Sequence, residues 1–416
     1  APTFTGERVG KRRMLLNDHG RTTRACATRK AGMGPTNSGV LEAGASVMSR
    51  YLRTPVELEP AFFPDGDYKP VLRCHLIPAP STGPEAVILK YVQQRPGKDR
   101  LGLFNEWAGL QFLSQLELDP PVSPTFYGGD REEGVVVLED LGAGDSLADV
   151  LLGSDAARAE AALLSFARTL GRMQAASIPS LGEYRRLRAE LGPPGGEAII
   201  EAGALATEFE RVLGSAGLSL RGAEEDVEAV IAGIAQPGPF LALVHGDACP
   251  SNELLVDQRV VLLDFATAGL RHALLDGVCG RVPFPSCWCA RRLPAHLPPL
   301  MEEGYRSELV RGCPAAEDDA AFASEAVSAT AYWLIETTTV ALSAMPSPDS
   351  MWGTSTIGQR LAHRGTLFAE LAQETGSYQG LAALITRLVD LLGLVDERMP
   401  LYPAFGGPPI ATSIDP

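Results

Sequence analysis

Segments that favour β-strands are concentrated near the start of this chain, and this segregation restricts the folds open to it. Four short apolar runs before residue 142 predict strands: 56–58, 71–77, 86–92 and 135–138. Apolar residues at helical spacing predict helices over 40–51 and 103–116. Beyond residue 142 only 241–244 and 260–263 resemble strands, and the rest predicts helices broken by Gly and Pro. The pattern indicates an α+β protein with a small β-rich part followed by a large, mainly helical part.

This pattern and the composition divide the chain into three regions. Residues 1–35 show no apolar periodicity, and the first 30 of them carry eight Lys or Arg against two acids, so we expect a disordered basic tail. Residues 36–141 form the small part, which we call the N-lobe, and residues 142–416 form the helical C-lobe. A chain of 416 residues is long enough for two such packed units.

Charge and cysteine content limit the partners and the compartment. The formal net charge of −15 disfavours nucleic acid and anionic membranes as partners. No apolar run approaches the length of a membrane span, and the seven cysteines show no disulfide spacing. We therefore expect a cytoplasmic protein in a reducing compartment. The sequence leaves the oligomeric state open.

One loop carries the strongest chemical signal in the chain. The segment His245-Gly-Asp247-Ala-Cys-Pro-Ser-Asn252 is followed by an apolar run that ends at Asp264. Phosphoryl transfer needs a carboxylate to accept or orient the proton of the attacking hydroxyl, and oxygen ligands to hold Mg²⁺ against the phosphates. The spacing supplies both kinds of group. The alternative is a turn with a capping Asp and an Asn in the left-handed region, and it does not account for the whole pattern.

A second pair of charged residues lies upstream of this loop. Lys90 lies at the end of an apolar strand-like run, and Glu106 lies on the apolar face of the next predicted helix. An inward carboxylate needs a partner. An ion pair with Lys90 would supply one and would leave the lysine free to reach nucleotide phosphates. The alternative for Lys90 is that its ammonium group extends past the strand to water.

The segment from His245 to Asn252, with the apolar run that ends at Asp264, resembles the catalytic and metal-binding loops of the aminoglycoside phosphotransferase and choline kinase group. Those enzymes are relatives of protein kinases and carry His-Gly-Asp in place of His-Arg-Asp. The resemblance implies a protein-kinase-like two-lobed fold with ATP in the cleft between the lobes. It makes Asp247 the catalytic base, with Asn252 and Asp264 as the Mg²⁺ ligands. It gives His245 and Asp276 a supporting, structural role.

The resemblance also implies nucleotide contacts in the N-lobe. Lys90, paired with Glu106, would reach the α- and β-phosphates. The hinge whose backbone would lie against adenine consists of Glu139, Asp140 and Leu141. The turn with Asp65 and Gly66 lies where relatives cover the phosphates, but it has a single glycine, and a plain hairpin turn remains an alternative.

The resemblance does not fix the residues that bind the acceptor. Trp288 and Arg291 are our candidates, because they follow closely on the catalytic segment; the plainer alternative is a core anchor beside a solvated cation. Cys279, Cys287 and Cys289 have spacings unlike those of a zinc knuckle, and we expect them to be buried small apolar residues.

The predicted function is transfer of the γ-phosphate of ATP, with Mg²⁺, to a hydroxyl of a small molecule: a sugar, amino sugar, aminoglycoside or amino alcohol. A nucleotide-binding pseudokinase or regulatory module is the alternative, and the joint presence of the lysine, the base and both metal ligands favours an enzyme. A protein kinase is disfavoured by His-Gly-Asp and by the lack of an Ala-Pro-Glu segment. The sequence does not name the acceptor or distinguish ATP from GTP.

Overall fold

The computed structural model describes residues 37–62, 71–92, 100–192, 202–344 and 347–409. The predicted tail at 1–35 and the turn with Asp65 and Gly66 lie outside the described residues. None of the helices in these ranges combines the length and the apolar character needed to cross a bilayer.

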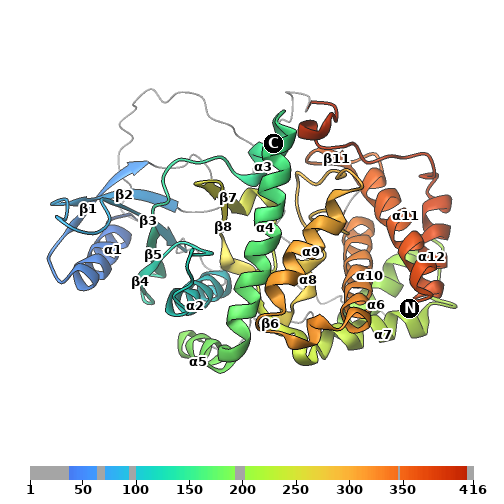
Figure 1. Ribbon diagram of the computed structural model, residues 1–416, viewed down its shortest axis with the longest axis horizontal. Coiled ribbons are helices and arrows are strands. Elements are labelled where there is room, and N and C mark those ends of the chain that lie inside the picture. Colours follow the sequence, from blue (N-terminus) through green and yellow to red (C-terminus); the bar gives the residue numbers. More distant parts are fainter. Residues whose placement is uncertain (1–36, 63–70, 93–99, 193–201, 345–346, 410–416) are drawn as a thin grey trace, which may run out of the picture.

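A five-stranded antiparallel sheet lies at one end of the molecule (Figure 1). Its strands are β1 (Glu57–Phe62), β2 (Val71–Ile77), β3 (Ala86–Tyr91), β4 (Phe126–Asp130) and β5 (Val135–Glu139). They are ordered β1-β2-β3-β5-β4. The sequence does not predict β4, because two glycines interrupt its pattern.

Helices cover both faces of this sheet. Val87 and Leu89 of β3 are fully buried in a core cluster with helix α1 (Asn37–Leu52). Ile88 packs against the larger core on the other face, which includes helix α2 (Leu101–Gln115). Because side chains alternate along a strand, Lys90 shares the face of Ile88. The alternation therefore directs Lys90 toward α2.

The rest of the described chain is mainly helical. Its helices are α3 (Leu147–Leu152), α4 (Ala156–Ser177), α5 (Leu181–Leu191), α6 (Ala202–Ser215), α7 (Glu224–Ala235), α8 (Leu274–Gly277), α9 (Leu297–Leu309), α10 (Asp319–Ala344), α11 (Ile357–Thr375) and α12 (Gln379–Leu391). Helix α4 runs through the middle of the molecule beside α9, and α6, α7, α10, α11 and α12 gather at the end far from the sheet (Figure 1). The predicted α+β class is confirmed, and the predicted boundary at residue 141 falls in the connector between β5 and α3.

Two small two-stranded antiparallel sheets lie among the helices. Strand β6 (Leu241–Val244) pairs with β9 (Gly269–His272), and β7 (Glu253–Val256) pairs with β8 (Arg259–Leu262). Of these four strands the sequence predicts only β6 and β8. All four strands are four residues long, but β9 carries Gly269, Arg271 and His272 and β7 begins with Glu253, so neither forms the continuous apolar run that marks β6. The β7–β8 turn uses Asp257 and Gln258 at positive φ, a backbone conformation that matches the twist of the strands. A further unpredicted pair is β10 (Met351–Trp352) with β11 (Ser355–Thr356).

Two buried arginines of α11 hold the segment 284–289 to the helical bundle. Arg360 is 1% exposed, and it donates to the carbonyl oxygens of Cys287 at 2.7 Å and Trp288 at 2.9 Å. Arg364 donates to the carbonyl oxygen of Pro285 at 3.0 Å. Burial, with a smaller contribution from the charge of Arg364, lowers the pKa of Arg360 to about 9. The segment is therefore fixed through its main chain.

Replacing Arg360 with Ala should lower the free energy of unfolding by about 3–5 kcal/mol, because charged hydrogen bonds are lost and the removal of a large, fully buried side chain leaves a cavity. Urea denaturation measures the change. Arg387→Ala on α12 is the matched control, because Arg387 is exposed and its removal should change stability by less than about 0.5 kcal/mol. Equal losses in the two variants would contradict the bracing role of Arg360.

Candidate active site

Buried groups fix the loop that follows β6. Gly246 has φ +81°, and a Cβ there would lie 2.6 Å from the carbonyl oxygen of Thr267, so only glycine fits without displacement. His245 is fully buried, and its Nε2 donates to the carbonyl oxygen of Leu263 at 2.8 Å. Thr267 Oγ1 donates to the carbonyl oxygen of His245 at 3.0 Å. These contacts connect the loop to the segment that carries Asp264.

The carboxyl group of Asp276 on α8 holds the start of this loop. It accepts hydrogen bonds from the backbone N–H groups of His245 at 2.7 Å and Gly246 at 3.2 Å. Behind it, Gln174 Nε2 lies 3.4 Å from Oδ2, and the hydroxyl of Tyr305 donates to Gln174 Oε1. Burial raises the pKa of Asp276, against the opposing effects of His245 and the two N–H groups. This arrangement supports a structural role for His245 and Asp276.

Asp247 lies on the same loop and is only partly buried. Asn252 Nδ2 donates to its carbonyl oxygen at 3.0 Å and to Oδ2 at 3.1 Å. Ser286 Oγ donates to Oδ1 at 2.7 Å. Each carboxylate oxygen therefore has a protein donor. Sequence reasoning missed Ser286, because only the packing of a segment 39 residues downstream brings it to this loop.

Lys90, Glu106 and Asp264 form a second cluster. Lys90 Nζ lies 2.5 Å from Glu106 Oε1 and 3.2 Å from Asp264 Oδ1. Glu106 is 3% exposed. Asp264 has a left-handed backbone with φ 63° and ψ 66°, which is uncommon for a residue other than glycine. The expected Lys90–Glu106 ion pair is present, and the lysine also reaches Asp264, which the sequence does not predict.

Asn105 is a further residue that sequence reasoning missed. It is buried on α2 beside Glu106, and its Nδ2 donates to the carbonyl oxygen of Ala266 at 3.1 Å. Its Oδ1 accepts from Arg188 Nε of α5 at 2.9 Å. Asn105 thus connects α2 to the turn after Asp264. One signal for this role was present in the sequence, because Asn105 is a polar residue directly before the inward Glu106.

The side chains of the predicted hinge are engaged within the protein. Glu139 Oε2 accepts from the backbone N–H of Thr125 at 3.0 Å and from its hydroxyl at 2.8 Å. Asp140 Oδ2 accepts from Arg73 Nε at 2.5 Å. What the hinge can offer a nucleotide is therefore its main chain and the half-buried side chain of Leu141.

The two acceptor candidates differ in their surroundings. Trp288 is half-buried and packs against the main core, with its carbonyl oxygen held by Arg360. Arg291 is 4% exposed, and its Nη1 donates to the carbonyl oxygens of Leu401 at 3.3 Å and Pro408 at 2.7 Å. This geometry favours a structural role for Arg291 over a contact with an acceptor or with solvent. The sequence cannot reveal this role, because it depends on a chain segment more than 100 residues downstream.

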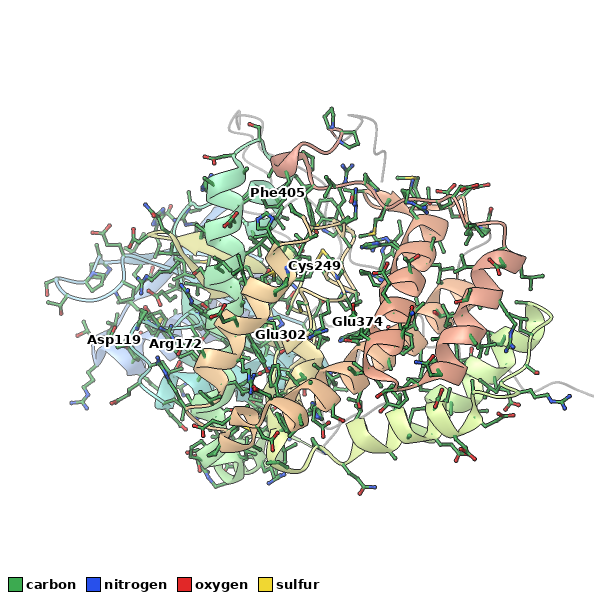
Figure 2. The ribbon with its side chains drawn as sticks, turned by 45° about the vertical axis from the view of Figure 1, so that its right-hand side comes forward. Asp119, Arg172, Cys249, Glu302, Glu374 and Phe405 are labelled. Carbon is green, nitrogen blue, oxygen red and sulfur yellow. A yellow bond between two sulfur atoms is a disulfide. The ribbon has the colours of Figure 1, made fainter. Side chains whose placement is uncertain are left out.

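Cys249, Cys287 and Cys289 form a buried sulfur cluster at the loop that carries Asp247, and Figure 2 shows Cys249 near the middle of the molecule. Cys249 and Cys287 form a disulfide, and Cys289 Sγ lies 3.0 Å from Cys287 Sγ. The expectation that no cysteine is cross-linked is therefore wrong; the bridge joins residues 38 positions apart, so spacing gives no hint of it. Cys279 and Cys289 are free and buried, as expected. With two sulfurs in a disulfide, the cluster does not offer a metal three thiolates.

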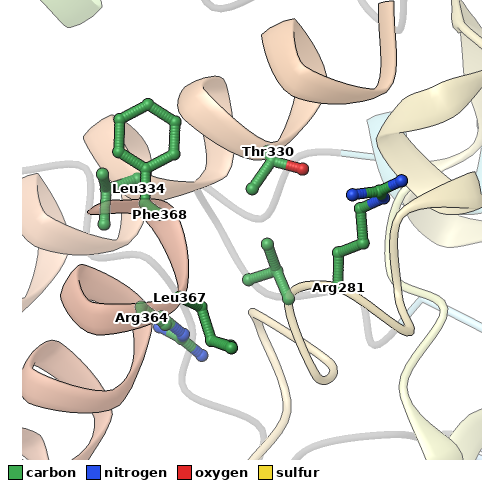
Figure 3. A pocket seen from close by; sticks show the side chains of 7 residues that line it. Arg281, Thr330, Leu334, Arg364, Leu367 and Phe368 are labelled. Atoms are coloured by element: carbon green, nitrogen blue, oxygen red, sulfur yellow. The ribbon is translucent and has the colours of Figure 1, made fainter. Parts of the chain in front are cut away.

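A small pocket lies between the helical bundle and the segment that follows α8 (Figure 3). Its cavity volume is about 10 Å³, far below the range of about 300–1,000 Å³ usual for small-molecule sites. Its two arginines are engaged, Arg281 with Glu302 and Arg364 with the carbonyl oxygen of Pro285. We therefore do not assign the acceptor to this pocket.

Glu253 is a buried acid directly after Asn252. It is fully buried, and neither of its carboxyl oxygens has a hydrogen-bond partner in the described part of the chain. Burial, followed by the charges of Asp247 and Asp276, raises the pKa of Glu253 well above its usual value. The folded protein therefore disfavours a third negative charge behind the loop.

Replacing Glu253 with Gln should stabilise the protein at high pH. The unfolded chain ionises this carboxyl near its usual pKa of about 4.3, while the folded chain keeps the proton, so wild-type stability falls by up to about 1.4 kcal/mol per pH unit between the two pKa values. Melting temperatures should therefore differ little near about pH 5 and increasingly toward about pH 8. Glu370→Gln, at an exposed site, controls for the loss of one negative charge. A gain that is equal at both pH values would contradict a protonated Glu253.

Comparison with known families gives one match of substantial length. The model of the phosphotransferase enzyme family matches residues 84–298, slightly more than half of the chain. The matched stretch contains Lys90, Asp247 and Asp264. No curated protein matches the chain.

Several solved structures are similar at low identity. An amicoumacin kinase is 13% identical, with a TM-score of 0.46, over 76% of this chain and 88% of its own. The aminoglycoside phosphotransferase APH(2'')-Ib is 13% identical, with a TM-score of 0.42, over 84% and 99%. A choline kinase from Cryptosporidium parvum is 13% identical, with a TM-score of 0.41, over 80% and 93%. At these values the structures carry no argument about activity.

Proposed function

The chain belongs to the phosphotransferase enzyme family, and from this premise we propose that it transfers the γ-phosphate of ATP to a hydroxyl group of a small molecule. The observation that carries the proposal is that the loop with Asp247 lies next to the turn with Asp264. The backbone N–H of Leu263 donates to the carbonyl oxygen of Asn252 at 2.7 Å, so the loop with Asp247 adjoins the residue before Asp264. A base and two oxygen ligands thereby come from adjacent segments.

Asn252 and Asp264 would hold Mg²⁺. Their donor set suits this ion, because Mg²⁺ prefers carboxylate and amide oxygens and retains several waters. The Nδ2 atom of Asn252 is directed at Asp247, which leaves its amide oxygen for a cation. When bound, Mg²⁺ would neutralise charge on the β- and γ-phosphates.

Lys90 and the hinge would hold the nucleotide. The ion pair with Glu106 orients the ammonium group of Lys90 toward Asp264, so phosphates bound at the metal site would lie within its reach. Adenine recognition would fall to the backbone of residues 139–141, because the side chains of Glu139 and Asp140 have protein partners.

Asp247 would act on the acceptor. Asn252 fixes Oδ2, so Oδ1 would accept or orient the proton of the attacking hydroxyl. The acceptor class we propose is a sugar, amino sugar, aminoglycoside or amino alcohol. A pseudokinase remains the alternative; it would bind nucleotide at the same groups without transferring phosphate.

Asp247→Asn should preserve folding and nucleotide binding and reduce transfer by about 10²–10⁴-fold, because the amide cannot accept the proton. ADP release in the presence of an acceptor measures transfer, and calorimetry measures nucleotide binding. Asp257→Asn, in the exposed β7–β8 turn, is the matched control and should keep wild-type activity. An Asp247→Asn enzyme within a few-fold of wild type would overturn the assignment of the base.

Asp264→Ala should abolish Mg²⁺-dependent nucleotide binding, and Asn252→Ala should weaken it less, because a neutral ligand contributes less than a carboxylate. Titration of Mg²⁺ at fixed nucleotide gives the metal dependence of each variant. If both variants keep the wild-type dependence, the metal site lies elsewhere.

A further inference from the structure

The hydroxyl of Ser286 has the contact with Asp247 that an acceptor hydroxyl needs. Its oxygen donates to Oδ1 at 2.7 Å, and Oδ1 is the carboxylate oxygen that Asn252 does not occupy. A hydroxyl in hydrogen-bond contact with a general base is poised to lose its proton during attack. Ser286 and Asp247 are both only partly buried, so neither is sealed within the core.

The position of Ser286 is fixed on both sides. The preceding carbonyl group, of Pro285, accepts from Arg364, and the following one, of Cys287, accepts from Arg360. Cys287 is also bonded to Cys249, which lies two residues after Asp247. The hydroxyl is therefore held relative to the base by covalent and charged contacts. Such preorganisation removes much of the entropic cost of bringing two reacting groups together.

We propose that Ser286 is itself a phosphoryl acceptor, so that this protein phosphorylates its own Ser286 when no small-molecule acceptor is bound. This inference rests on the proposed function. The Ser286 oxygen forms a bond to the γ-phosphorus of ATP, and the bond from that phosphorus to the oxygen bridging the β-phosphorus breaks. ADP leaves with the bridging oxygen, and the hydroxyl proton passes to Asp247 Oδ1. ATP is the only co-reactant.

Two neighbouring hydroxyl groups are directed elsewhere. Ser251 lies on the catalytic loop itself, but its oxygen contacts Cys249 Sγ at 3.2 Å. Thr267 Oγ1 donates to the carbonyl oxygen of His245. A hydroxyl that is only near the loop is therefore not placed to accept a phosphoryl group. The hydroxyl of Ser286 is so placed, because it contacts Asp247.

Phosphorylation of Ser286 would close the acceptor site. A phosphoserine carries nearly two negative charges at neutral pH, and it would lie against the carboxylate of Asp247. It would occupy the space of an acceptor hydroxyl and repel the base. The modified enzyme should therefore turn over a small-molecule acceptor more slowly, and a bound acceptor should protect Ser286.

The test is incubation of the chain with Mg²⁺ and ATP without an acceptor, followed by intact-protein mass spectrometry and phosphopeptide mapping. Wild type should gain one phosphoryl group at Ser286, at a rate constant independent of protein concentration. Ser286→Ala should gain none, and Asp247→Asn should gain it about 10²–10⁴-fold more slowly. Ser215→Ala, at the exposed end of α6, is the control and should behave as wild type. Nucleotide binding by every variant verifies that each is folded.

Three outcomes would overturn the inference. If ADP is released with a small-molecule acceptor while Ser286 stays unmodified, the inference about Ser286 is wrong and the proposed function stands. A phosphoryl group that persists in Ser286→Ala places the modification on another residue. No phosphate on the protein and no ADP release with any acceptor removes the proposed function, and this inference with it.

Discussion

The buried carboxyl group of Asp276 is the interaction on which the geometry of the site depends. It satisfies the backbone N–H groups of His245 and Gly246, in a stretch where Gly246 has a positive φ. Without it, two buried donors would lose their partner, at about 1–3 kcal/mol each. From His245 the hydrogen-bond network continues to the carbonyl oxygen of Leu263. One buried acid thus positions both the loop with Asp247 and the segment that ends at Asp264.

Ionisable side chains surround this network. Lys90 neutralises Glu106 and contacts Asp264, so two carboxylates share one cation across the sheet, α2 and the turn that carries Asp264. The carboxyl oxygens of the nearby Glu253 have no hydrogen-bond partner among the residues that the structure describes, and burial raises the pKa of this group well above its usual value. The site therefore presents its negative charge where a cation and a proton would be handled, and not in the core behind it.

The sequence predicted what depends on local pattern and missed what depends on distant contacts. Apolar periodicity was sufficient for the sheet-then-helix order and for an inward Glu106 that needs a cation. Strands β7 and β9 escaped prediction because polar residues interrupt their apolar pattern, so that pairing with β8 and β6 stabilises them more than their own composition does. The contacts of Ser286 and Arg291 and the Cys249–Cys287 bridge join segments 38 to 117 residues apart. The sequence near each residue gives no indication of such long-range contacts.

The central claim, that this chain moves a phosphoryl group from ATP to a small-molecule hydroxyl, is tested most directly by the fate of the γ-phosphate. The measurement is incubation with Mg²⁺ and γ-labelled ATP against a panel of sugars, aminoglycosides and amino alcohols, with mass spectrometry of every small molecule. The account predicts that one class gains the labelled phosphoryl group in an amount equal to the ADP formed. Tight, Mg²⁺-dependent binding of ATP with no labelled product and no ADP would contradict it and would identify the chain as a pseudokinase.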